Sequence, residues 1–112
     1  MPKAKEEERI VRTEALFRDV NERIAEASER FRAGEAEFMC ECADPGCTER
    51  LEVPLEEYEE VRSDGAQFVL DPDHVVPEVE RVVEKRRGYA VVEKLGAVGR
   101  AVTRLDPRTN LA

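Results

Sequence analysis

The chain has 112 residues, a formal net charge of −8, three cysteines, one histidine and no tryptophan. This length suits one domain with a modest core, since aromatic residues make up only 5% of the sequence. No apolar run is long enough to span a membrane and no secretory signal follows Met1, so we expect no membrane association. An odd number of closely spaced cysteines argues against a disulfide framework and predicts a reducing, cytoplasmic location.

The charge is unevenly distributed along the chain. Residues 1–34 are neutral overall, residues 35–80 have a net charge of −13, and residues 81–112 have a net charge of +5. The acidic middle would repel phosphate backbones, so binding to nucleic acid is not expected. We expect the basic C-terminal third to pair with the acidic middle instead.

The first stretch, residues 5–33, predicts one long helix that Gly34 ends. Apolar residues recur every seven positions as in a coiled-coil seam, with smaller residues between them. The seam consists of Ile10, Phe17, Ile24 and Phe31, with Thr13, Val20 and Ala27 at the intervening positions. We therefore expect an N-terminal amphipathic helix over residues 1–34. Its seam over residues 10–31 would bind the chain's own sheet, a second copy of the chain or a protein partner.

The rest of the chain, residues 35–112, predicts a small zinc-binding α+β domain. Residues 37–42 and 48–53 are expected to form a hairpin with the cysteines at its tip. Residues 44–47, Asp-Pro-Gly-Cys, have the composition of a type II turn. Pro54 can open a short helix over residues 55–62.

A second antiparallel sheet is expected further along the chain. Residues 67–70 predict a buried strand, and the turn at 71–74 carries His74. Residues 78–87 have helical start signals, but their charges favour a hairpin with residues 91–94 across a three-residue turn at 86–88. The expected pairs are Glu80 with Lys94, Arg81 with Glu93, and Val83 with Val91. A short helix over residues 96–105 closes the α+β fold.

The cysteines and the histidine are the candidate metal ligands. Cys40, Cys42 and Cys47 form a tight cluster, and His74 is the only histidine. Three thiolates and one imidazole are the ligand set of a closed tetrahedral Zn²⁺ site. The alternative is three inert, buried thiols, but the acidic neighbours of these cysteines are unlike the surroundings of a core thiol. Other candidates for the fourth ligand are Glu41, Asp44 and Asp73.

The motif Cys-x-Cys-x-Asp-Pro-x-Cys at residues 40–47 resembles one found in an uncharacterised family of short acidic proteins from high-GC Gram-positive bacteria. The similarity covers nearly the whole chain but implies no activity. The similar segments are residues 16–24, 40–50, 57–62 and 91–94, together with Phe68 and His74. Those proteins have glycine where this chain has Asp73. A weaker similarity to CDGSH-type iron–sulfur proteins is interrupted at Thr48, where they have aspartate, and by the distance to His74.

The function that this pattern favours is a non-catalytic zinc-binding protein that serves as an interaction or regulatory module. A closed site leaves no coordination position for water. A thiol-based redox sensor is the first alternative. A zinc or iron–sulfur enzyme is a weaker one, because the sequence has no Ser-His-Asp set and no glycine-rich phosphate loop.

Overall fold

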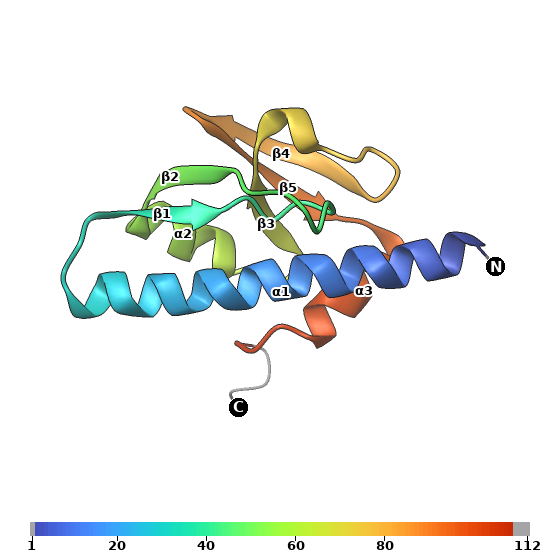
Figure 1. Cartoon of the computed structure of the whole chain (residues 1–112), viewed down its shortest axis with the longest axis horizontal. Helices are drawn as coiled ribbons and strands as arrows, with labels where there is room; N and C mark the ends of the chain where they lie inside the picture. The colour runs from blue at the N-terminus through green and yellow to red at the C-terminus, as the bar shows by residue number, and fades with distance from the viewer. Residues whose placement is uncertain (1, 109–112) are drawn as a thin grey trace.

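The computed structural model describes residues 2–108 and shows a long helix, two antiparallel sheets and short helices (Figure 1). The α+β class is thereby confirmed. None of the helices in the described part of the chain has the length and apolarity that crossing a membrane requires. The elements are α1 (Pro2–Arg30), β1 (Glu35–Met39), β2 (Arg50–Pro54), α2 (Leu55–Arg62), β3 (Gln67–Leu70), the 3-10 helix η1 (Pro72–His74), β4 (Glu80–Arg86), β5 (Tyr89–Lys94) and α3 (Gly96–Arg104).

The two sheets are small and both are antiparallel. The first pairs β1 with β2, and the second has the strand order β3-β5-β4. Residues 78–87 therefore contribute a strand and not a helix. The predicted pairs Glu80–Lys94 and Arg81–Glu93 are confirmed.

The predicted pairing of Val83 with Val91 is wrong. A β-bulge follows Val82, so that Glu84 lies opposite Val91 and Val83 has no partner in the ladder. The turn also differs, because Arg86 pairs with Tyr89 and leaves a loop of two residues. The second of these is Gly88, whose φ of 86° favours glycine.

Helix α1 packs against β1, α2 and α3, and in Figure 1 it runs along the lower side of the sheets. The seam is only partly covered: Phe17 is buried, whereas Phe31 lies beyond the end of the helix and is 79% exposed. The heptad prediction is therefore wrong at Phe31. The most central stripe of α1 is instead mostly polar, with buried side chains at Val11, Glu14, Arg18, Asn21 and Ala25.

Helix α1 ends at Arg30, and the residue that terminates it in the left-handed conformation is Arg32 and not Gly34. Arg32 adopts a left-handed conformation with φ of 56°. The N–H of Ala33 donates to the carbonyl of Ser28 at 2.8 Å, and the N–H of Arg32 donates to the carbonyl of Glu29 at 3.0 Å. This is the Schellman pattern, in which glycine normally occupies the left-handed position.

We expect Arg32→Gly to raise the free energy of unfolding by roughly 0.5–1 kcal/mol, because glycine removes the steric cost of positive φ. Ala33→Gly is the matched control, since Ala33 is equally exposed but lacks positive φ. The control should lose stability. Urea unfolding of both variants measures the two changes, and a loss of stability in Arg32→Gly would contradict this account of the helix end.

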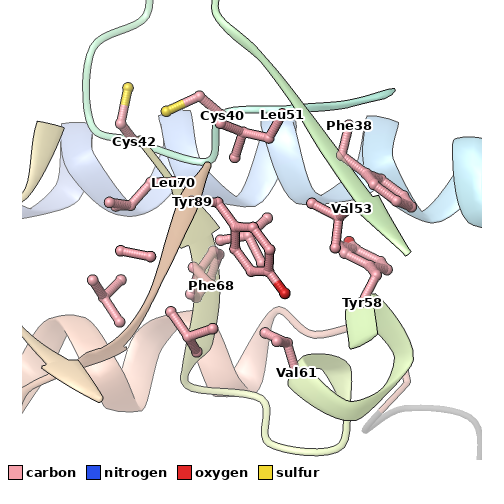
Figure 2. Packing of buried hydrophobic residues seen from close by; sticks show 14 of the residues in the cluster. Phe38, Cys40, Cys42, Leu51, Val53, Tyr58, Val61, Phe68, Leu70 and Tyr89 are labelled. Atoms are coloured by element: carbon pink, nitrogen blue, oxygen red, sulfur yellow. The ribbon is translucent and has the colours of Figure 1, made fainter. Parts of the chain in front are cut away.

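The apolar core lies between α1, the sheets and the two short helices. The rings of Phe38 and Tyr58 stack with centroids 4.1 Å apart, and Phe68 and Leu70 are fully buried. Figure 2 shows Cys40 and Cys42 at one side of this cluster, with the Phe38–Tyr58 pair at the other.

Charged side chains are also buried in this core. The ammonium of Lys94 donates to the carboxylate of Glu14 at 2.6 Å and also pairs with Glu80, and all three side chains are almost inaccessible to solvent. The guanidinium of Arg18 donates to the carbonyl of Val102 at 2.6 Å and lies over the ring of Phe68. These contacts tie α1 to the C-terminal end of β5 and to α3, and hydrophobic periodicity does not reveal them.

Candidate metal centre

The four predicted ligands come from the loop between β1 and β2 and from the end of η1. Cys40 directly follows β1, and its N–H donates to the carbonyl of Glu49 at 3.1 Å, which extends the hairpin ladder into the loop. His74 is the last residue of η1, which follows β3 after Asp71. The side chain of Asp71 accepts a hydrogen bond from the N–H of Asp73 at 2.8 Å and so caps η1.

A tight turn brings Cys47 back toward the other cysteines. Its N–H donates to the carbonyl of Asp44 at 3.0 Å, and the carboxylate of Asp44 accepts from the N–H of Gly46 at 2.9 Å. Gly46 does not have a positive φ, so the predicted type II turn is wrong. The Asp44 side chain supports the turn instead, as aspartate does when it bonds to the backbone two residues on.

The structure brings Cys40, Cys42, Cys47 and His74 together, with one ligand atom of each within 4.8 Å of the others. The Nδ1 atom of His74 lies 3.4 Å from the sulfur of Cys40 and 3.7 Å from that of Cys47. Around a tetrahedral zinc ion, Zn–S bonds of about 2.3 Å and Zn–N bonds of about 2.0 Å place sulfur and nitrogen about 3.5 Å apart. The four atoms therefore have the spacing that a single metal ion requires.

Glu41 is fully buried and is not part of the ligand cluster. Its carboxylate accepts hydrogen bonds from the N–H of Val69 at 2.9 Å, from the amide of Asn21 at 2.8 Å and from the hydroxyl of Tyr58 at 3.1 Å. Its own N–H donates to the carbonyl of Val69 at 2.9 Å. Glu41 is thus a support of the loop and not the alternative ligand that the sequence allowed.

Neither of the other alternative ligands joins the cluster. The carboxylate of Asp44 is engaged by Gly46, and Asp73 lies on the exposed side of η1. The sulfur of Cys40 receives a further hydrogen bond from the N–H of Asp71 at 3.2 Å. A backbone donor of this kind stabilises thiolate charge.

Asn21 connects helix α1 to the strand that leads into the site. Its amide donates to the carbonyl of Met39 at 2.9 Å and its oxygen accepts from the N–H of Met39 at 2.8 Å. Neither Asn21 nor Glu41 was predicted from the sequence to support the site. The sequence does contain a signal for Glu41. Alternate residues of an extended segment point to opposite sides, so Glu41 is expected on the side opposite to Cys40 and Cys42.

The three thiols and the imidazole lie close enough to shift one another's pKa values. A hydrogen bond from the thiol of Cys40 lowers the pKa of Cys42 to about 5, and the backbone N–H of Asp44 acts in the same direction. The same contact raises the pKa of Cys40, and burial raises the pKa of Cys47. Burial alone would lower the pKa of His74, but the Cys42 thiolate raises it. A cation bound here would displace the protons of the other ligands, so metal binding should strengthen as pH rises.

Comparisons of this chain with protein-family models, with curated proteins and with solved structures find no match. The resemblance to short acidic bacterial proteins therefore stays an expectation. Function has to be argued from the site, where three sulfur atoms and one imidazole nitrogen surround one position.

Proposed function

We propose that the protein is a non-catalytic zinc-binding module in which Cys40, Cys42, Cys47 and His74 hold one Zn²⁺. The single observation that carries the proposal is the grouping of the four ligand atoms within 4.8 Å. Three thiolates with one imidazole favour zinc among the common divalent metals, because soft sulfur ligands in a tetrahedral array suit it best. A binuclear iron–sulfur cluster would distribute its ligands over two irons and separate them more widely.

The metal would join segments that otherwise have few apolar contacts. Residues 43–50 are mostly exposed, and none of the three residues of η1 is buried. Zinc would fix this loop to η1 and thereby fix the adjoining ends of β1 and β3. Its contribution would be to folding, as in other closed sites with four protein ligands.

Cobalt(II) substitution distinguishes this structural site from an open, catalytic one. With all four ligands bound, we expect the intense visible absorption of tetrahedral Co²⁺ with thiolate ligands, at one equivalent per chain. Added azide or cyanide at moderate concentration should leave this spectrum unchanged, because no coordination position is free for an external ligand. A shift of the spectrum on azide binding would refute the non-catalytic function.

A redox role of the same site is a second candidate, and the accessibility of the ligands favours it. Cys47 is only half-buried, and an open hollow of about 360 Å³ lies beside Cys42 and His74. Two thiolates could reduce one peroxide to water and form a disulfide, which would release the zinc. Zinc release at low micromolar peroxide, reversed by a thiol reductant, would support this role. Zinc retention at millimolar peroxide would contradict the redox role and leave only the structural role of the site.

The proposal also includes a protein partner and a cytoplasmic location, where thiol ligands stay reduced. The chain's own domain already contacts part of the seam, since Phe17 is buried and Ile10 and Ile24 pack against the core. A partner of α1 therefore has to use another face of the helix.

A further inference from the structure

One face of helix α1 is left uncovered along most of its length. We define the outer stripe as the residues at spacings of three and four that share this face. All seven are exposed, and among residues 2–108 none of the six charged members makes an ion pair within 4 Å. The outer stripe consists of Lys5, Glu8, Arg12, Leu16, Asp19, Arg23 and Glu26.

The order of charges along the outer stripe is antisymmetric about its middle. Reading from the N-terminus the signs are plus, minus, plus, then Leu16, then minus, plus, minus. If a second copy of the helix is laid antiparallel with its centre at Leu16, every charge faces the opposite charge. The facing pairs are Arg12 with Asp19, Glu8 with Arg23, and Lys5 with Glu26, each formed twice in the symmetric pair. A parallel arrangement would instead place every charge against its own kind.

The centre of the outer stripe is apolar and lies at a groove. Leu16 is 62% exposed. Beside it, α1 and α3 form a groove of about 660 Å³ whose apolar lining includes Ala15, Ala101 and Leu105. Small alanines allow close approach of another helix, and Leu105 is itself 53% exposed. The apolar centre and its charged flanks have the layout of a core and a rim.

We propose that two copies of this chain associate through antiparallel pairing of their α1 helices. The two-fold axis passes beside Ala15 and Leu16, and the leucine of each copy enters the α1–α3 groove of the other. A two-fold interface must be self-complementary, and the antisymmetric charge order satisfies that condition. The contact from Lys5 to Glu26 spans about 31 Å of helix. In Figure 1, residues 35–80, which carry the negative charge, lie mainly above α1, whereas α3, which lines the groove, lies below it.

Charge reversal at the central pair tests both the association and its direction. In the full chain, Arg12→Glu places two glutamates opposite two aspartates, and Asp19→Arg places two arginines opposite two arginines. Each variant alone should therefore dimerise at least tenfold more weakly than the parent chain. A mixture of the two variants should form a heterodimer, because both central pairs are then complementary. Sedimentation velocity and native mass spectrometry at 5–300 μM measure these outcomes, and at 0.5 M salt the parent dimer should weaken.

Two controls keep the test interpretable. Glu29→Arg reverses an exposed charge outside the outer stripe and should change the dimer dissociation constant less than twofold. Leu16→Glu should give a folded monomer that melts at the same temperature as the parent chain diluted below its dimer dissociation constant, because this side chain is exposed in the single copy. The proposal is overturned if the parent chain stays monomeric at 300 μM, if the single reversals dimerise as well as the parent, or if their mixture forms no heterodimer.

Discussion

Removal of zinc from the site should lower the free energy of unfolding by about 4 kcal/mol or more. This is the stabilisation expected when the free zinc concentration exceeds the dissociation constant of the site a thousandfold. Cys42→Ser should have the same effect. The reason is geometric, because Cys42 is 2% exposed and the metal would join its loop to His74. For a chain of this size the melting temperature should fall by roughly 15 °C or more.

Calorimetry of the parent chain, the chelated chain and Cys42→Ser measures this effect. Ala43→Ser is the matched control, since it adds a hydroxyl at the next position without removing a ligand. It should bind one zinc and melt within a few degrees of the parent. An unchanged melting temperature after complete removal of zinc would contradict a structural role of the site.

Lys94→Met should cost about 3–5 kcal/mol at pH 7, as expected when one partner of a buried ion pair is removed. The substitution leaves the carboxylates of Glu14 and Glu80 in the core without their common cation. One oxygen of Glu14 already lacks a hydrogen-bond partner, so it has no second group to compensate the loss. Urea unfolding of the variant measures the change directly.

The matched control lies one register position away on the same two strands. Arg81 pairs with Glu93 as Glu80 pairs with Lys94, but the Arg81 side chain is 60% exposed. Arg81→Met should therefore cost less than about 1 kcal/mol. Equal losses in Arg81→Met and Lys94→Met would contradict the account of the buried cluster.

The cost of Lys94→Met should also depend on pH. Burial raises the pKa of Glu14 to about 7, although Lys94 acts in the opposite direction. When the pKa of a carboxyl group is higher in the folded state than in the unfolded state, the group stabilises the fold at pH values below its unfolded-state pKa. This stabilisation is lost as the pH rises through the folded-state pKa. Without Lys94 the pKa of Glu14 should rise further. The deficit of the variant should therefore be smaller at pH 5.5 than at pH 8.

The elements, and the grouping of the three cysteines with His74, were predicted from the sequence because most of their signals are local. The cysteine spacing and the strand-like runs are readable within a few residues, whereas the type II turn predicted before Cys47 was wrong because the Asp44 side chain supports a different turn. The pairs Glu80–Lys94 and Arg81–Glu93 were also predictable, because complementary charges mark the register of a hairpin. The bulge at Val83 carries no comparable sequence signal.

The buried polar contacts of α1 could not be predicted in this way. Hydrophobic periodicity assigns Glu14, Arg18 and Asn21 to the surface, whereas the fold buries all three. Their partners are distant in sequence: Glu14 meets Lys94, and Arg18 meets the carbonyl of Val102. Only the tertiary arrangement brings such groups together. The sequence therefore predicted that an apolar seam of α1 faces the core, whereas the residues that face it most directly are mostly polar.

X-ray absorption at the zinc edge of the purified chain tests the central claim most directly. We predict one zinc per chain with three sulfur ligands at about 2.3 Å and one nitrogen ligand at about 2.0–2.1 Å. His74→Ala should remove the nitrogen contribution and leave the three sulfur ligands. A chain that binds no stoichiometric zinc, or one whose zinc is surrounded mainly by oxygen, would contradict the assignment of Cys40, Cys42, Cys47 and His74 as a structural metal site.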